Sequence, residues 1–153
     1  MIGVDRIDVT KGLPERLEAY RRFLQRNKRM HGRVVLMQVA VPSRTNIPRY
    51  RELQQKVDEM VGQINGHYGT PDWSPIVYIR RNLPHNELAA LYALADVALV
   101  TPLRDGQNLV AKEYVACQPE GDGVLILSEF AGAAAEMGEA LLVNPMDADG
   151  VAK

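Results

Sequence analysis

Short apolar runs alternate with amphipathic segments along nearly the whole chain, and this alternation is the feature that most restricts its fold. The apolar runs have the length of buried strands, which we expect at 2–4, 33–41, 75–79, 97–100, 123–128 and 140–143. The segments between them keep helical apolar spacing, and we expect helices near 14–32, 49–67, 86–94, 104–117 and 131–136. Buried strands joined by helices form a parallel sheet covered on both faces. The sequence therefore predicts an α/β fold with a doubly wound, mainly parallel Rossmann-like sheet.

Length and charge set the broad class of protein. At 153 residues the chain is long enough for one domain with a sizeable core, so we expect residues 1–153 to form a single Rossmann-like domain. Its formal net charge is −1, which gives no overall attraction to nucleic acid or to an anionic membrane. We therefore expect neither partner, and any bound anion must be held by a local site.

The cysteine and histidine content argues against a metal centre. Cys117 is the single cysteine, and His31, His67 and His85 are far apart without the spacing of metal ligands. We expect no metal site and no cofactor. Because the sequence also shows no membrane-spanning run and no signal-peptide pattern, we expect a soluble protein in the reduced cytoplasm.

Basic residues gather on the first expected helix. Because leucines keep helical apolar spacing beneath them, we interpret these basic residues as one solvated outer face. The residues concerned are Arg16, Arg21, Arg22, Arg26, Lys28 and Arg29.

In a doubly wound sheet, ligands bind beyond the carboxyl ends of the strands, so the loops there are the candidates for chemistry. The first, residues 5–14, carries Arg6 and Lys11 just before a helix begins. Two cations at a helix N-terminus are typical of a phosphate or diphosphate site. An alternative is that Arg6 pairs with Asp5 or Asp8 while Lys11 is solvated, and the spacing does not choose between them.

Three further loops give weaker signals. Residues 41–46 place Arg44 directly beyond a buried strand, where it suits capture of a phosphate or carboxylate but can also be an ordinary surface arginine. Residues 84–86 have the composition of a helix start, so His85 is expected near a cap rather than as a catalytic base. The small residues of 128–136 allow close approach of the backbone either to a ligand or to the sheet.

The stretch RDGQNLVAKEY, residues 104–114, leaves a buried strand through polar and turn-forming residues. On a helical wheel drawn from Asn108, Glu113 falls inside the apolar sector, where an unpaired carboxylate is costly. Asp105 and Glu113 therefore suit the binding of ligand hydroxyl groups, beside the first free amides of the helix. The alternative is that Asp105 only caps the helix and Glu113 pairs with Lys112 or a buried amide.

Several of these segments together resemble one enzyme family. GVDRIDVTKGLPERL, PSR, ADVALVTPLRDGQNLVAKEYVA, LSEFAGAAAE and ALLVNP are similar to the trehalose-6-phosphate synthase family of retaining glycosyltransferases. The similarity runs from Gly3 to Pro145. It implies a GT-B fold, in which two Rossmann-like domains face each other. This chain resembles most of the C-terminal, nucleotide-sugar-binding domain, so we expect the N-terminal acceptor domain to be absent from it.

The resemblance also implies roles for individual residues. It assigns the donor diphosphate to Arg6 and Lys11, the ribose to Glu113 and the acceptor phosphate to Arg44. The transferred glucose is assigned to Asp105 and to the backbone amides of Gln107, Asn108, Leu109 and Val110, and Gly106 is counted among the donor-binding residues. Asn82 and Leu83 occupy the positions beside the base.

In this family no protein nucleophile is expected, so the catalytic group consists of Arg6, Lys11 and Asp105. The sequence departs from the family pattern at Gln107, commonly Met, and at Val9, commonly aromatic. Asn82 and Leu83 stand where many members have His-Phe. The last departure bears on the choice of base.

The expected activity is therefore transfer of glucose from UDP-glucose to glucose 6-phosphate, giving trehalose 6-phosphate. GDP-glucose and ADP-glucose are the alternative donors, and glycerol 3-phosphate is an alternative acceptor. Other readings are a non-catalytic nucleotide-sugar-binding module, or a regulatory α/β domain that has lost its ligand. We expect the isolated chain to be inactive without its N-terminal domain. Its expected partner is either that domain or a second copy of the chain, through self-association.

Overall fold

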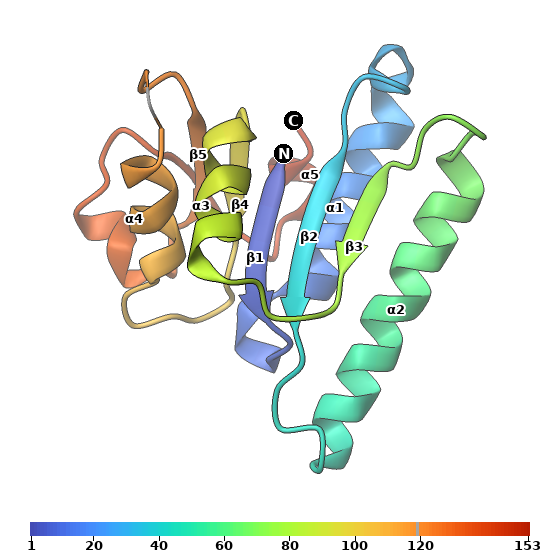
Figure 1. Cartoon of the computed structure of the whole chain (residues 1–153), viewed down its shortest axis with the longest axis horizontal. Helices are drawn as coiled ribbons and strands as arrows, with labels where there is room; N and C mark the ends of the chain where they lie inside the picture. Colours follow the sequence, from blue (N-terminus) through green and yellow to red (C-terminus); the bar gives the residue numbers. More distant parts are fainter. Residues whose placement is uncertain (119) are drawn as a thin grey trace.

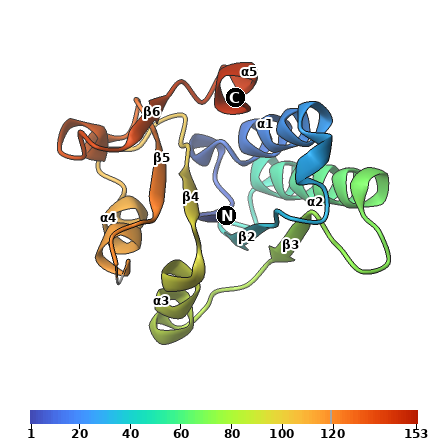
Figure 2. The same cartoon turned by 90° about the horizontal axis from the view of Figure 1, so that it is seen from above.

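Six parallel strands form one sheet in the order β3-β2-β1-β4-β5-β6 (Figures 1 and 2). The computed structural model describes residues 1–118 and 120–153. The chain starts at the centre of the sheet, builds outward to β3, and then crosses to the other side of β1 to add β4, β5 and β6. The strands are β1 (Ile2–Arg6), β2 (Leu36–Val41), β3 (Ile76–Ile79), β4 (Val97–Val100), β5 (Val124–Ser128) and β6 (Leu141–Val143). This confirms the predicted doubly wound parallel fold.

Helices cover both faces of the sheet (Figure 2). One face carries α1 (Leu13–Arg26), α2 (Pro48–Tyr68) and α5 (Ala148–Val151), and the other carries α3 (His85–Leu94) and α4 (Leu109–Ala116). Short 3-10 turns occur at η1 (Val9–Lys11), η2 (Lys28–Met30) and η3 (Gly132–Ala135). Within the described residues, no helix combines the length and the apolar character needed to cross a membrane.

Successive side chains along the central strands point to opposite faces of the sheet and pack in two separate cores. Val4 and Val100 belong to the core beneath α3 and α4, whereas Leu99 and Ala40 belong to the core beneath α1 and α2. A strand buried on both faces must be apolar at successive positions, which is why these strands read as continuous apolar runs. Because the strands are parallel, their carboxyl ends lie at one edge of the sheet, which is the lower side of Figure 1.

Most expected elements are present, and the differences have local causes. The helix expected over 104–117 begins only at Leu109, because Asn108 takes a left-handed backbone (φ 73°) and its side chain accepts the Ala111 amide at 3.2 Å. The segment expected as a helix over 131–136 is the 3-10 turn η3, and α5 was not predicted.

The basic face of α1 was predicted wrongly at one position. Arg16 is buried, with 1% of its surface exposed, while Arg26, Lys28 and Arg29 are exposed as expected. Its partner is the buried carboxylate of Asp5, 2.7 Å from the guanidinium. A helical wheel cannot show this, because the compensating charge comes from a strand and not from the helix.

Candidate functional site at the carboxyl edge of the sheet

The loops that follow β1 and β4 meet through an ion pair. Lys11 Nζ lies 2.5 Å from Asp105 Oδ2, although the two residues are 94 positions apart in the chain. Their side chains are 17% and 16% exposed. The two loops are also joined by backbone hydrogen bonds, since the amides of Leu103 and Arg104 donate to the Thr10 carbonyl at 2.8 and 3.1 Å. Two of the expected site residues are thus in direct contact.

The loop that carries Lys11 is rigidly built. Asp8 Oδ1 accepts hydrogen bonds from the backbone amide and the hydroxyl of Thr10, at 3.0 and 2.9 Å, and so begins the turn η1. Gly12 ends that turn with φ 66°, and a Cβ there would lie 2.7 Å from the Thr101 carbonyl oxygen. Only glycine suits this position, because both the backbone conformation and the space exclude a side chain.

The alternative pairing of Arg6 is not found. Asp5 pairs with Arg16, and Asp8 is bonded to Thr10. Arg6 is exposed and makes no ion pair with any residue that the structure describes. Lys11 is paired rather than solvated. Arg6 is therefore a cation without an ion-pair partner among the described residues, and it lies in the same loop as the Lys11–Asp105 pair.

Asp105 is held by three donors. Besides Lys11, it accepts from Asn108 Nδ2 at 3.0 Å and from the Gln107 amide at 3.4 Å. Partial burial alone would raise the pKa of Asp105, but the hydrogen bond and charge of Lys11 outweigh it and hold the pKa below its ordinary value. Because Asn108 and not Asp105 caps α4, the interpretation of Asp105 as a helix cap is wrong.

The small residues after β5 support this loop. The Gly132 amide donates to the Asp105 carbonyl at 2.9 Å, and the Ala133 amide donates to the Gln107 carbonyl at 2.8 Å. These two hydrogen bonds fix the backbone of residues 105–107 against the segment that follows β5. The small side chains of this segment therefore permit close approach of backbone to backbone.

The first turn of α4 supplies free amides beside Asp105. The Ala111 amide is used by the Asn108 side chain, and the amides of Leu109 and Val110 precede any intrahelical partner. Gly106 and Gln107 are exposed, so an approaching ligand can reach this turn. An array of amides at the positive end of a helix suits hydroxyl or phosphate oxygens.

Glu113 lies partly buried between α3 and α4. Tyr92 Oη donates to Glu113 Oε2 at 3.4 Å. The pKa of Tyr92 is raised, mainly by burial and to a smaller extent by the negative charge of Glu113. Lys112 pairs instead with Glu136 at 2.6 Å, so the alternative Glu113–Lys112 pair is wrong. Glu113 borders a cavity of roughly 260 Å³ whose other lining residues are His85, Leu88, Ala89, Tyr92, Ala116 and Cys117. A carboxylate at the rim of a mostly apolar cavity can receive hydroxyl groups of a ligand.

Arg44 is linked to the first loop through Tyr50. Its Nη1 donates to Tyr50 Oη at 2.9 Å, its guanidinium lies 5.5 Å from the centre of the Tyr50 ring, and Tyr50 Oη lies 3.4 Å from Asp8 Oδ2. Arg44 is exposed, with a left-handed backbone of φ 47°. It therefore stays available to an anion at the same edge as Arg6.

The two residues expected beside the base differ in accessibility. Asn82 is exposed, whereas Leu83 is 7% exposed and packs in the core beneath α3 and α4. The Leu83 side chain is thus a core residue, and only its backbone and Asn82 remain for a ligand.

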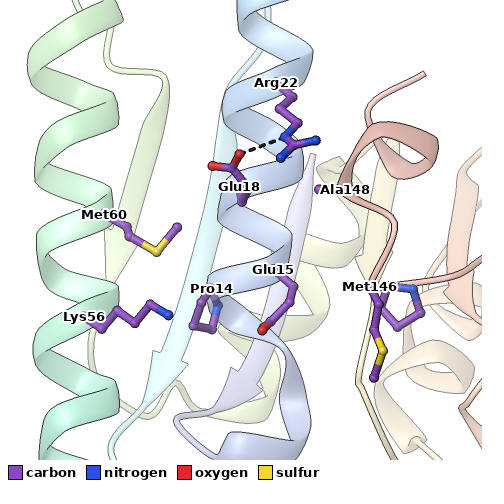
Figure 3. A pocket seen from close by; sticks show the side chains of 9 residues that line it. Pro14, Glu15, Glu18, Arg22, Lys56, Met60, Met146 and Ala148 are labelled. Atoms are coloured by element: carbon purple, nitrogen blue, oxygen red, sulfur yellow. Dashed lines mark hydrogen bonds and ion pairs between the residues drawn. The ribbon is translucent and has the colours of Figure 1, made fainter.

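A separate cavity lies away from these residues. It has a volume of roughly 360 Å³ between α1, α2 and the segment that precedes α5, and its lining includes Glu15, Glu18, Arg22 and Lys56 (Figure 3). None of the expected site residues lines it. Within the part of the chain that the structure describes, no cluster of three potential metal ligands occurs.

Sequence reasoning missed three residues that shape the site. Asp8 could have been found, because Asp-x-Thr before a turn is a local capping pattern. Tyr50 and Tyr92 carry no sequence signal, since each acts through a partner on a different element.

The strand order and the meeting of loops between β1 and β4 define a Rossmann-like α/β domain with its candidate site at the topological switch point. The model of glycosyltransferase family 20 matches residues 1–153, and the chain belongs to that family. The resemblance seen in the sequence segments is therefore confirmed.

Two curated relatives illustrate the similarity. The chain is 53% identical to a trehalose-6-phosphate synthase of Sinorhizobium fredii over 153 residues, covering 99% of this chain and 33% of the relative. It is 52% identical to a bifunctional trehalose-6-phosphate synthase/phosphatase of Thermoproteus tenax, covering 100% of this chain and 21% of that protein. The chain thus spans about a third or less of the length of these relatives.

Solved structures share the fold at high identity. A UDP-forming α,α-trehalose-phosphate synthase from Burkholderia xenovorans in complex with glucose-6-phosphate has a TM-score of 0.96 and 47% identity. An E. coli structure with UDP-2-fluoro glucose bound has a TM-score of 0.96 and 46% identity. Each comparison covers 99% of this chain and 34% of the other.

Proposed function

We propose that this chain is the donor-binding domain of a retaining glucosyltransferase that transfers glucose from UDP-glucose to glucose 6-phosphate, giving trehalose 6-phosphate. The observation that carries the proposal is the convergence of Arg6, the Lys11–Asp105 pair and the N-terminus of α4 at one edge of the sheet. The names of the relatives, and the UDP-sugar and glucose-6-phosphate in the related structures, support the same reaction.

The two cations of the first loop act on the leaving group. When the bond between glucose C1 and the diphosphate oxygen breaks, negative charge grows on UDP. Arg6 and Lys11 stabilise that charge as donors fixed before the reaction begins. The acceptor hydroxyl forms the new bond to C1 from the same face, and its proton passes to the departing phosphate oxygen. No side chain of this chain needs to act as a nucleophile.

The second loop and α4 hold the sugars of the donor. Asp105 stays ionised through Lys11 and therefore accepts hydrogen bonds from glucose hydroxyls. The amides of Leu109 and Val110 donate to glucose oxygens, and Glu113, beside Tyr92, receives the ribose hydroxyls. The base lies near Asn82 and the backbone of Leu83.

Arg44 binds the phosphate of the acceptor, because a guanidinium suits bidentate capture of phosphate. The rest of the acceptor pocket belongs to a second Rossmann-like domain that faces this edge, so the present residues form the C-terminal domain of a GT-B enzyme. The second, acceptor-binding domain is therefore the partner that this chain needs for activity.

Calorimetric titration tests the donor site. The purified chain is titrated with UDP, GDP, ADP and uridine, and we expect UDP to bind most tightly. Arg6→Ala is expected to weaken UDP binding by about 10-fold or more, the effect of losing a charge-assisted hydrogen bond, and to leave uridine binding unchanged. Lys28→Ala, which removes an exposed cation on η2, is the matched control. If none of the three diphosphates binds, the proposed function is wrong.

A turnover assay tests the division of labour between domains. We expect the 153-residue chain alone to bind UDP-glucose without transferring glucose, because positioning donor and acceptor together accounts for about 7 to 11 kcal/mol of such a barrier. UDP release and disaccharide phosphate are followed in the presence of glucose 6-phosphate. Turnover on the order of 1 per second or faster would show that this chain builds a complete site.

A further inference from the structure

Arg16 is a buried charge that the proposed chemistry does not use. It lies on α1 with 1% of its surface exposed, and its guanidinium donates hydrogen bonds to three side chains. The acceptors are Asp5 Oδ2 at 2.7 Å, Gln38 Oε1 at 3.2 Å and Thr101 Oγ1 at 3.0 Å. They belong to β1, to β2 and to the residue directly after β4, which are three neighbouring strands of the sheet. Arg16 therefore joins the centre of the sheet from one side.

The guanidinium has little freedom to move. A Cβ at Gly3 would lie 2.8 Å from both Arg16 Nη1 and Gln38 Oε1, so the absence of a side chain there makes the space. Gln38 is fixed in turn, because its Nε2 donates to the carbonyls of Gly3 and Val39 at 3.1 and 3.2 Å. In the described residues every buried side-chain polar atom has a partner, so this network is complete.

Two of the three acceptors lead directly into the candidate site. Asp5 is followed by Arg6, and Thr101 begins the loop that carries Asp105. Burial is the largest effect on Asp5 and raises its pKa, while the charge and hydrogen bond of Arg16 act to lower it. Lys11 and Asp105 also lie near enough to Asp5 to shift this pKa, in opposite directions. A displacement of either strand end would therefore be transmitted to the Lys11–Asp105 pair.

Stability alone explains this arrangement poorly. A buried ion pair is often no more stabilising than apolar residues of the same volume, whereas the planar guanidinium fixes the geometry of several acceptors at once. On the basis of the proposed function, we propose that Arg16 is a positioning residue. It holds the ends of β1 and β4 at the separation at which Lys11 meets Asp105, and so sets the spacing between the diphosphate and glucose subsites.

Arg16→Lys tests this role, because lysine keeps the charge but cannot donate in a fixed plane. Hydrogen exchange of the ligand-free chain is measured at the amides of Leu103 and Arg104, which join the two loops. We expect these amides to exchange about tenfold faster relative to Leu127 of β5, as in a local opening. We also expect the affinity for UDP to fall about fivefold or more beyond any change for uridine.

Leu24→Ala is the matched control, since Leu24 is fully buried in the last turns of α1, away from the site. It should lower overall stability without changing the exchange ratio or the ratio of UDP to uridine affinity. If Arg16→Lys behaves in the same uniform way, Arg16 is only structural and the proposal is overturned.

If Arg16→Lys does not fold, Thr101→Val decides by the same two readouts, because it removes one acceptor and keeps the shape. A smaller change in the same direction supports the proposal, and no change in either ratio overturns it. Failure of the unchanged chain to bind UDP would refute the proposed function, whereas the exchange ratio would still decide the role of Arg16.

Discussion

Replacing Lys11 by Ala is the sharpest test of the candidate site. In the free protein one of its three ammonium donors is used on Asp105 at 2.5 Å, which leaves two for a diphosphate. Loss of a charge-assisted hydrogen bond costs about 1.5 to 3 kcal/mol, so UDP should bind about 10- to 150-fold more weakly. Uridine has no diphosphate, and its affinity should stay the same.

The stability cost of the same change is smaller. Asp105 would keep the donors of Asn108 and Gln107, so its carboxylate is not left without partners. The Lys11–Asp105 pair is partly exposed, and we expect its loss to cost about 1 kcal/mol, between the values of surface and buried pairs. For a chain of this length that corresponds to a fall in Tm of about 2 to 4 °C.

Calorimetry with UDP and uridine, together with thermal unfolding, measures both effects. Lys28→Ala serves as the control for loss of one positive charge. Equal losses for UDP and uridine would mean that Lys11 supports the whole domain and does not contact the diphosphate. Unchanged UDP binding with a lowered Tm would show that the Lys11–Asp105 pair is purely structural.

Three further changes probe separate features. Glu113→Gln should weaken nucleotide binding and leave Tm nearly unchanged, because Gln keeps the shape and one acceptor; a large fall in Tm with unchanged binding in the same titration would contradict the ribose role. Gly12→Ala should lower Tm in thermal unfolding by about 2 °C or more. A left-handed backbone costs about 1 to 2 kcal/mol for a residue with a side chain, and the new Cβ would also clash with the Thr101 carbonyl oxygen. Hydrogen bonds from Arg21 and Arg22 outweigh burial and lower the pKa of Glu18 from 4.5 to about 2. The ionised carboxylate therefore stabilises the fold at pH values above 4.5, and this contribution is lost as the pH falls from 4.5 to about 2. Glu18→Gln should therefore flatten the fall of Tm over this pH range, and an unchanged acid profile would mean that the ion pairs of Glu18 contribute nothing.

The sheet could be predicted from the sequence because its central strands are buried on both faces. Short apolar runs such as 97–100 and 124–128 are typical of strands inside a parallel sheet, and their last residues mark the carboxyl edge of that sheet. The helix boundary at Leu109 could not be read in the same way, because it depends on the backbone conformation of Asn108. Periodicity reports which face is buried, but it does not report where a cap begins.

The site was predictable only as a set of separate loops. Spacing placed Arg6 and Lys11 at a helix start and Asp105 in a turn, but nothing local indicated that Lys11 and Asp105 touch. Arg16 was assigned to solvent because its partners lie on other elements: Asp5 belongs to β1, and Thr101 directly follows β4. Contacts that depend on tertiary structure escape any reading based on neighbours along the chain.

The Lys11–Asp105 pair has an electrostatic consequence for donor binding. At this edge Arg6, Lys11 and Arg44 are opposed by Asp8 and Asp105, which leaves a single net positive charge among these groups. An unpaired Asp105 carboxylate would repel a diphosphate placed beside it. In the proposed donor site, Lys11 neutralises that carboxylate and still has donors left, so the same residue would make a glucose subsite compatible with a diphosphate subsite next to it. A carboxylate suited to sugar hydroxyls can therefore lie beside a leaving group of the same charge.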